Sequence, residues 1–286
     1  MTEPRQPSAP PPEPPHLAPE IADHYAAGLE GGRLSGGRSR LELVRTQLLI
    51  GRHLPPPPQV ILDVGGGTGV YSRWLAGRGY EVHLIDPVPL HVAQAQQVSV
   101  REGEGPPASI RTGDARHLDQ GDSTADAVLL LGPLYHLTES DERRLALGEA
   151  RRVLRPGGLL FAAGISRFAS LLDGLGRGLL EDPTFAAIVE RDLRDGQHRN
   201  PTQNPAYFTT AYFHHPDELE AEVRRAGFAV QETVAVEGPG SLIPDFERWW
   251  DDPARRRRLL EAIRAVEHER SLLGVSAHLL VIGRRT

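Results

Sequence analysis

The sequence predicts an α/β fold with a doubly wound, mostly parallel sheet. Short apolar stretches, typical of buried strands, alternate with longer stretches whose apolar residues recur at helical spacing. This alternation indicates βαβ units, in which the strands run parallel and the crossovers are right-handed. The first half of the chain is expected to form strands over residues 60–64, 81–85, 109–111, 127–131 and 159–163, with helices over 68–78, 90–100 and 140–154.

The composition divides the chain into a tail and one domain. Residues 1–19 are polar and rich in proline, so we expect a disordered tail that packs no core. Residues 20–286 are expected to form a single domain. Its parts are an N-terminal helical cap over 20–58, a binding core over 59–167, a helical insertion or lid over 168–213, and the C-terminal part of the sheet over 214–286.

Serine and proline positions predict several helix ends. Ser39 and Ser140 are candidate N-caps, and Pro216 suits the first turn of a helix over 216–226. The elements expected after that helix are a strand over 228–236, one long helix over 246–268 and a last strand over 277–282.

Composition and charge narrow the class of protein. The chain has 286 residues and no cysteine, which excludes disulfides, thiolate metal sites and a cysteine nucleophile, and which fits a reducing cytoplasm. A net charge of -6 argues against nucleic acid as a partner. No apolar run reaches the length of a membrane helix, and the first 20 residues lack the apolar core of a secretory signal. We therefore expect a cytoplasmic protein with no membrane partner.

A glycine-rich turn is the clearest functional signal. The segment Gly65-Gly66-Gly67-Thr68-Gly69 follows the strand over 60–64 and opens a helix. Glycines let a ligand approach the backbone, and ligands of open parallel sheets bind at the carboxyl ends of the strands. Asp86 ends the next strand about twenty residues on, where dinucleotide-binding folds place the carboxylate that holds the ribose hydroxyls. The turn therefore predicts a nucleotide site.

The details of the turn disfavour a dinucleotide. The third glycine of the G-x-G-x-x-G pattern would fall on Val70 or Ser72, and no P-loop motif occurs. Asp63 lies two residues before the first glycine and would repel a pyrophosphate. The same carboxylate would favour a ligand that carries an ammonium and a sulfonium. An alternative role for Asp63 is to shape the turn without touching the ligand.

The segment from Asp63 to Gly69 resembles motif I of the class I S-adenosylmethionine-dependent methyltransferases, and the resemblance extends over roughly 60–165. Gly113-Asp114-Ala115 resembles the family's adenine-binding turn, and Arg151 to Leu159 resembles its helix-to-strand signature. The resemblance implies a Rossmann-like, seven-stranded sheet with an antiparallel last strand. It also implies S-adenosylmethionine as cofactor and S-adenosylhomocysteine as product.

The resemblance also implies particular cofactor residues. Asp86 would bind the ribose and Asp114 the adenine amino group, although either carboxylate could instead cap a helix. Arg33 or Arg45 could pair with the methionine carboxylate, or could be a surface arginine. The residues expected at the cofactor are Tyr25, Arg33, Arg45, Asp63, Gly65, Gly66, Gly67, Thr68, Gly69, Asp86, Pro87, Gly113, Asp114, Ala115, Leu131 and Gly132.

The methyl acceptor is expected at the end of the fourth strand, in Leu131-Gly132-Pro133-Leu134-Tyr135-His136. Gly132 replaces the polar residue that begins the Asn/Asp-Pro-Pro-Tyr motif of enzymes acting on planar amino groups, which disfavours nucleic-acid bases. Tyr135 and His136 are the catalytic candidates, for substrate contact or proton removal. For His136 a purely structural role is the alternative. No histidine spacing predicts a zinc helix, so no metal is expected.

The sequence thus favours methyl transfer to a small-molecule acceptor. The alternatives are a protein methyltransferase, a non-catalytic S-adenosylmethionine-binding protein and, less favoured, an NAD-dependent oxidoreductase. The acceptor atom is not readable from the residues, and the sequence leaves open whether the chain forms a homodimer.

Overall fold

The computed structural model describes residues 17–286 except 27, 29, 103–104 and 203. Most of the expected proline-rich tail, residues 1–16, therefore lies outside the described residues. Among the residues that are described, no helix combines the length and the apolar character needed to cross a membrane.

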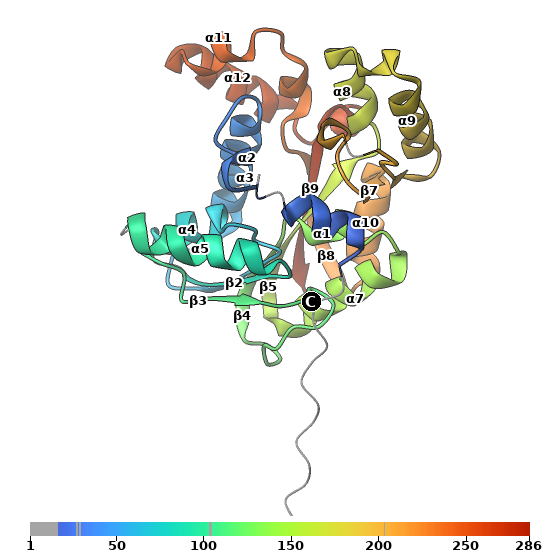
Figure 1. Cartoon of the computed structure of the whole chain (residues 1–286). Coiled ribbons are helices and arrows are strands. Elements are labelled where there is room, and N and C mark those ends of the chain that lie inside the picture. Colours follow the sequence, from blue (N-terminus) through green and yellow to red (C-terminus); the bar gives the residue numbers. More distant parts are fainter. Residues whose placement is uncertain (1–16, 27, 29, 103–104, 203) are drawn as a thin grey trace, which may run out of the picture.

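A central sheet organises the molecule (Figure 1). Its strand order is β3-β2-β1-β4-β5-β7-β6, while β9 pairs with both β5 and β8. The strands are β1 Val60–Val64, β2 Glu81–Asp86, β3 Ser109–Thr112, β4 Ala125–Leu130, β5 Leu154–Ser166, β6 Gln197–His198, β7 Ala211–His214, β8 Phe228–Ala235 and β9 His278–Arg285. The four strands β1 to β4 run parallel to their neighbours, and β9 is antiparallel to both of its partners, as expected.

The sheet has nine strands rather than the expected seven. The difference arises because β5 continues to Ser166, beyond the expected end at residue 163. This extension offers an edge to β7, which pairs with it at Ile165 and Ser166, and β7 in turn pairs with the two-residue β6. The end of the expected lid is thereby joined to the sheet.

Both faces of the sheet are covered by helices, which confirms the doubly wound α/β fold. Alternate strand residues point to opposite faces, so Ile61 packs with α3 and α4 while Leu62 packs with α7 and α10. Because both faces are buried, the central strands are predominantly apolar, although β1 contains Asp63 and β4 contains Asp126. The principal helices are α3 Ser39–His53, α4 Val70–Ala76, α5 Pro89–Glu102, α7 Ser140–Val153 and α10 Pro216–Arg225.

Three helix ends differ from the sequence-based expectation. The long helix over 246–268 is two helices, α11 Phe246–Trp250 and α12 Pro253–Val266. The break occurs because Asp252 accepts hydrogen bonds from the first amides of α12, and Pro253 suits only a first turn. Ser39 and Ser140 are not N-caps, since each is the first helical residue and neither helix has a side-chain cap.

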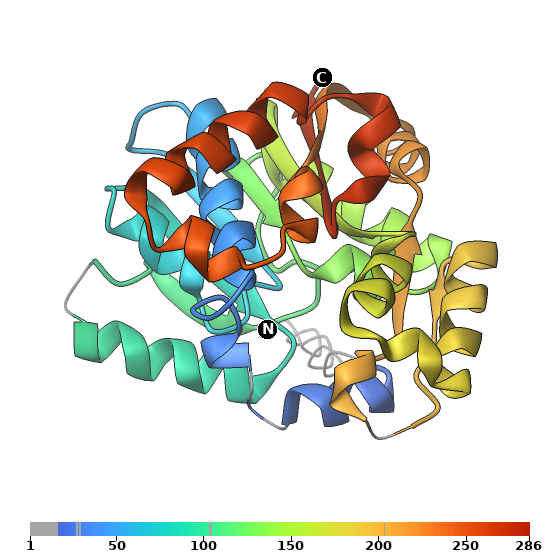
Figure 2. The ribbon, with the colours of Figure 1, turned by 90° about the horizontal axis from the view of Figure 1, so that it is seen from above.

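The insertion after β5 is helical, as expected, and lies beside the helix α1, Pro19–Ala26 (Figure 2). It comprises α8 Ala169–Arg177, α9 Pro183–Asp195 and short turns of 3-10 helix, including Pro205–Tyr207. The N-terminal helix α1, Pro19–Ala26, reaches this insertion, because the Thr209 hydroxyl donates to the Glu20 carbonyl at 3.0 Å.

Arg45 is part of the core of the fold and not of a ligand site. It is 1% exposed, its Nε donates to the Val236 carbonyl at 2.8 Å, and its Nη2 lies 2.6 Å from the Glu267 carboxylate. Arg52 contacts the other oxygen of Glu267 at 2.5 Å. The sequence-based assignment of Arg45 to the methionine carboxylate is therefore wrong, because its guanidinium already has an anionic partner that ties α3 to the C-terminal part.

Replacing Arg45 with alanine should lower the free energy of unfolding by about 3–5 kcal/mol, since the change strips a buried carboxylate of one partner. Chemical denaturation monitored by circular dichroism measures the loss. The matched control is Arg177→Ala, which removes an exposed pair with Asp173 and should change stability by less than about 1 kcal/mol. Equal losses in the two variants would contradict a structural role for the Arg45–Glu267 pair.

Candidate functional site

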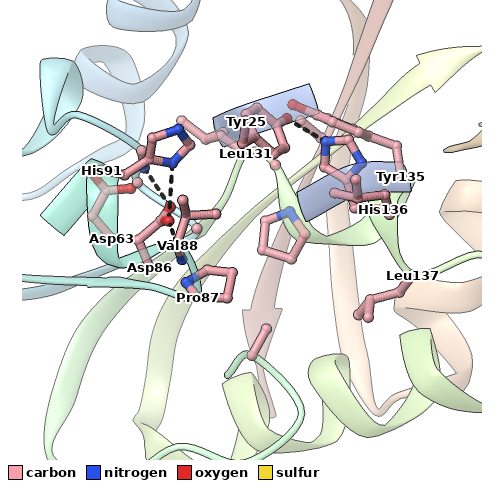
Figure 3. A pocket seen from close by; sticks show the side chains of 18 of the residues that line it. Tyr25, Asp63, Asp86, Pro87, Val88, His91, Leu131, Tyr135, His136 and Leu137 are labelled. Atoms are coloured by element: carbon pink, nitrogen blue, oxygen red, sulfur yellow. Dashed lines mark hydrogen bonds and ion pairs between the residues drawn. The ribbon is translucent and has the colours of Figure 1, made fainter. Parts of the chain in front are cut away.

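A cavity opens at the carboxyl ends of β1, β2 and β4, where the sequence placed the ligand (Figure 3). Asp86 and His91 stand on one side of it, and Tyr135 and His136 on the other. The sequence candidates that line it are Tyr25, Arg33, Asp63, Gly65, Gly66, Gly67, Thr68, Asp86, Pro87, Asp114, Ala115, Leu131, Gly132, Tyr135 and His136.

The glycine turn leaves no room for side chains. Gly65 has a φ of +70°, and a Cβ on it would lie 2.7 Å from the ring of Pro133. A Cβ on Gly66 would lie 2.7 Å from the carboxylate of Asp63. The backbone of the turn therefore passes directly over Asp63 and against the loop that follows β4. As a result, the segments that follow β1 and β4 lie side by side at the cavity.

Asp63 is a buried carboxylate beneath this turn. The Ser72 hydroxyl donates to its Oδ2 at 2.7 Å, whereas Oδ1 has no hydrogen-bond partner among the described residues. Burial raises the pKa of Asp63 to about 6, and Ser72 opposes part of that rise. The position agrees with a role in shaping the turn, and the unpartnered oxygen also keeps an acceptor available at the cavity.

Asp86 links the turn to the second strand. Its Oδ2 accepts the Gly67 amide at 2.8 Å, and its Oδ1 accepts the Val88 amide at 2.9 Å and lies 3.1 Å from His91 Nδ1. A carboxylate has about four acceptor positions, so one remains on Oδ2. The bond to Val88 just before α5 resembles a cap, and the same carboxylate faces the cavity, so both expected roles are compatible.

Asp114 does not cap a helix. The segment after it forms a tight turn in which the Arg116 amide and guanidinium both donate to its carboxylate, at 2.8 Å and 2.6 Å. The turn keeps the Asp114 carboxylate at the cavity wall, beside Ala115.

Two further sequence candidates, Gly69 and Gly113, lie behind the cavity wall. Gly69 is the N-cap residue of α4, where its φ is +80°. A Cβ on Gly113 would lie 2.6 Å from the Ile85 side chain, so glycine is required there for packing between β2 and β3. Neither residue is among those that line the cavity, and we correct both to structural roles.

His136 is held in its neutral form. It ends the short helix α6, Pro133–His136, and its Nε2 lies 2.5 Å from the Tyr25 hydroxyl. Its Nδ1 lies 3.4 Å from the carbonyl of Thr210. Burial lowers the pKa of His136 to about 3, so the ring carries no charge at neutral pH. Through Tyr25, this histidine connects the loop after β4 to helix α1.

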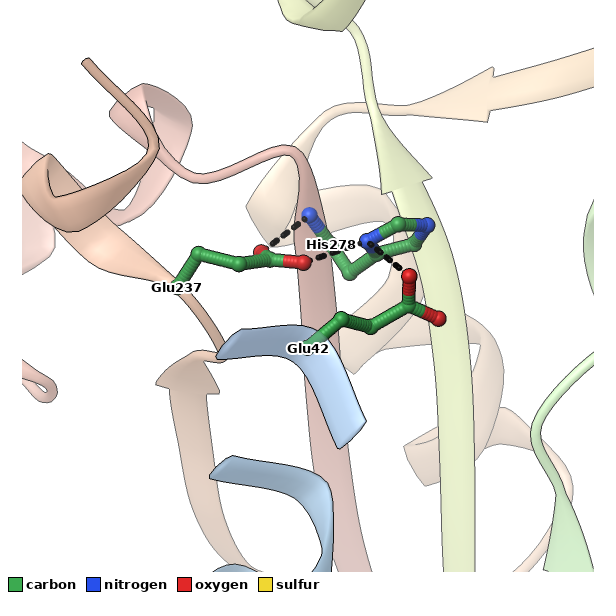
Figure 4. A group of neighbouring side chains, drawn as sticks. All are labelled: Glu42, Glu237 and His278. Carbon is green, nitrogen blue, oxygen red and sulfur yellow. Dashed lines mark hydrogen bonds and ion pairs between the residues drawn. The ribbon is translucent and has the colours of Figure 1, made fainter. Parts of the chain in front are cut away.

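A second cluster at the cavity was not found from the sequence. Glu42 on α3, Glu237 after β8 and His278 at the start of β9 come together from three distant segments (Figure 4). His278 Nδ1 lies 2.6 Å from Glu237 and 4.0 Å from Glu42. Burial alone would lower the pKa of His278, but the two carboxylates outweigh it and raise the pKa to about 9.

No sequence signal would have revealed this cluster, because its members are separated by 195 and 41 positions and belong to no motif (42 to 237, and 237 to 278). Their ligand atoms lie within 4.8 Å of one another, a spacing that a metal ion could also use. The expected absence of a metal therefore stays a prediction.

Replacing Gly113 with alanine should lower the free energy of unfolding by about 1–3 kcal/mol, because the added methyl group collides with Ile85. Thermal unfolding checks this. The control is Gly148→Ala on α7, where nothing lies within 4 Å of the added carbon and alanine should be neutral or stabilising. A Gly113 variant as stable as the control would disprove the packing role.

Comparison with known proteins agrees with this geometry. A family model described as a methyltransferase domain matches residues 61–158. A ubiquinone/menaquinone biosynthesis C-methyltransferase from Acidiphilium cryptum is 34% identical over 179 residues, covering 61% of this chain and 68% of that protein. A malonyl-[acyl-carrier protein] O-methyltransferase from Geobacter sulfurreducens is 36% identical over 172 residues, covering 60% of this chain and 56% of that protein.

The solved structures agree on the fold. An S-adenosylmethionine-dependent methyltransferase from Methanosarcina mazei superposes with a TM-score of 0.56 at 17% identity, covering 83% of this chain and 96% of that one. Motif, sequence relatives and fold point the same way: the chain belongs to the class I S-adenosylmethionine-dependent methyltransferase family.

Proposed function

We propose that the cavity binds S-adenosylmethionine and that the enzyme transfers its methyl group in line to a small-molecule acceptor. In this assignment Asp86 holds the ribose hydroxyls, Asp114 meets the adenine amino group, and the glycine turn takes the methionine end. The observation that carries the proposal is that Asp86, Asp114 and the Gly65–Gly67 turn line one and the same cavity. Further residues line that cavity as well, which leaves a place for the acceptor beside the cofactor.

Unsatisfied buried atoms support this assignment. Asp63 Oδ1 and His91 Nε2 are both buried at the cavity without a hydrogen-bond partner in the described part of the chain. Native proteins rarely leave such groups unpaired, so each favours a ligand with polar groups. One acceptor position on Asp86 Oδ2 is also left, and a ribose hydroxyl would fill it.

The acceptor is proposed to bind in the same cavity, beside the cofactor. Apart from the glycine turn, Asp86 and Asp114, the cavity lining combines apolar residues, Leu34, Ala163 and Leu280 among them, with polar residues including Arg33 and Tyr135. Such a lining suits a small, partly apolar molecule with at least one polar group. The chain spans between 56% and 68% of the two relatives described above, whose names give a quinone-pathway C-methyltransferase and an O-methyltransferase, so the acceptor atom is open.

The described residues of the cavity would contribute to catalysis mainly by aligning the methyl donor with the acceptor. S-adenosylmethionine supplies an activated methyl group, and correct alignment of donor and acceptor is worth roughly 7–11 kcal/mol. Tyr135 and His136, the two catalytic candidates from the sequence, line the cavity on the side opposite Asp86 and His91, where they would contact the acceptor. None of the described residues of the insertion over 168–213 lines the cavity, so its expected role as a lid stays a prediction. The absence of cysteine and the net charge of -6 favour a cytoplasmic enzyme without a nucleic-acid partner.

Calorimetric titration with S-adenosylmethionine, S-adenosylhomocysteine and NAD tests the cofactor. We expect both adenosyl compounds to bind and NAD not to bind. Asp86→Asn should weaken both at least about tenfold, because it replaces a charged acceptor of ribose hydrogen bonds. Asp122→Asn is the matched control, since Asp122 is exposed, pairs with Arg152 and lies outside the cavity.

Binding of NAD alone, or an equal effect of the two substitutions, would contradict the assignment. If the adenosyl compounds bind, turnover with a panel of small hydroxyl, amine and carbon acceptors then separates a methyltransferase acting on small molecules from one that requires a protein.

A further inference from the structure

We propose that His278, positioned by Glu237, takes the proton that leaves the acceptor during methyl transfer, and that the acceptor is therefore a small molecule whose reacting atom carries a removable proton, such as a hydroxyl group. This inference rests on the proposed function and deepens it. For a hydroxyl group, the reaction forms a bond from the acceptor oxygen to the methyl carbon and breaks the bond from that carbon to sulfur. The electron pair of the broken bond goes to sulfur, and the hydroxyl proton goes to Nε2 of His278.

The geometry fixes which nitrogen of His278 can act. Nδ1 lies 2.6 Å from Glu237 Oε1, so Nδ1 carries the hydrogen and donates it to the carboxylate. Nε2 makes no hydrogen bond with any described residue, and His278 lines the cavity. The neutral ring, which is the minor form at pH 7 because the pKa is about 9, therefore presents the lone pair of Nε2 as its free acceptor.

The carboxylate behind the histidine is itself held in place. Glu237 is buried, and its Oε2 accepts the Ser276 hydroxyl at 2.8 Å and the His278 amide at 2.9 Å. The oxygen of Ser276 in turn accepts the amides of Glu237 and Gly238. A fixed carboxylate of this kind orients an imidazole and stabilises the imidazolium that forms when it takes a proton.

Glu42 and Glu237 both raise the pKa of His278, and Glu237 is the carboxylate in direct hydrogen-bond contact with it. Glu42 on α3 lies 4.0 Å from Nδ1, but the guanidinium of Arg33, at the end of the short helix α2 (Glu30–Arg33), binds both oxygens of Glu42, at 2.8 Å and 3.0 Å. These are the charged groups that face the ring from neighbouring elements, and the Glu42–Arg33 pair is close to neutral overall.

His136 is poorly suited to the same task. Both of its nitrogens already face a partner, the Tyr25 hydroxyl and the Thr210 carbonyl, and burial lowers its pKa to about 3. A base with so low a pKa would return the proton at once. His278 differs because its Nε2 is open. Its pKa of about 9 keeps most of the rings protonated at neutral pH, so proton uptake would increase as the pH rises toward 9 and as the sulfonium of bound S-adenosylmethionine lowers that pKa.

A proton fits the cluster better than a metal ion does. A metal between Glu42, Glu237 and His278 would need Nδ1 as a ligand, and that nitrogen would have to release the hydrogen it gives to Glu237. It would also compete with Arg33 for Glu42. The test below is therefore run with a chelator present, and repeated without it.

The proposal can be tested without knowing the acceptor. S-adenosylmethionine and S-adenosylhomocysteine differ by one positive charge on sulfur, and a histidine facing the sulfur should sense it. Nuclear magnetic resonance of histidine-labelled protein would follow the titration of His278, assigned with His278→Asn, in each saturated complex. We expect a pKa lower by about 1 with S-adenosylmethionine, as for a charge roughly 10 Å away at an effective dielectric constant of about 20.

Two substitutions and the tautomer of the His278 ring add further tests to the comparison of the two complexes. Glu237→Gln should lower the pKa of His278 in both complexes, whereas the control Glu232→Gln, next to His53 and His268 outside the cavity, should not. The nitrogen chemical shifts should show the neutral ring with hydrogen on Nδ1. Should Glu237→Gln fail to fold, the comparison of the two complexes of the unaltered protein still decides.

Each other outcome has a distinct meaning. Equal pKa values in two complexes that both form, or a neutral ring with hydrogen on Nε2, would overturn the role of His278 and leave the proposed function standing. Failure of both compounds to bind would instead remove the proposed function, and with it this inference. Titration of His278 that appears only after chelation would overturn the proton-transfer role in favour of a metal site.

Discussion

The cavity depends on one steric constraint, the passage of the backbone after β1 directly over the carboxylate of Asp63. A side chain at Gly66 would occupy the place of that carboxylate, and one at Gly65 would meet Pro133. Two hydrogen bonds fix the turn: the Ser72 hydroxyl donates to Asp63, and the Gly67 amide donates to Asp86. Together these contacts hold the carboxyl ends of β1, β2 and β4 around the opening of the cavity.

The buried charges of this chain fall into two kinds. Arg45 and Glu267 satisfy each other across 2.6 Å and join the N-terminal cap to the C-terminal part. Asp63, by contrast, is buried with one unpartnered oxygen, and its pKa rises to about 6. The Arg45–Glu267 pair supports the fold, whereas the unmet hydrogen bond of Asp63 lies at the cavity, where a ligand can complete it.

Two histidines show how environment assigns different chemistry to one residue type. His136 and His278 both line the same cavity. Burial without an anion lowers the pKa of His136 to about 3, while carboxylates beside His278 raise its pKa to about 9 despite burial. The first is a neutral hydrogen-bonding group, and the second has the environment of an acid–base group.

Local patterns in the sequence determined the α/β class, the glycine turn and the position of Asp86 at the end of the second strand, because each depends on neighbouring residues. The antiparallel last strand and Asp114 at the cavity were implied by the family resemblance rather than by a local pattern. Contacts between distant segments decided the rest. The burial of Arg45 needs Glu267, and the strand pairing of residues 211–214 needs the extended end of β5. The pairing of Glu237 with His278 likewise exists only because β8 and β9 are adjacent in the folded sheet. Spacing along a chain encodes local geometry, whereas ion pairs and pKa values depend on distances that only the folded chain sets.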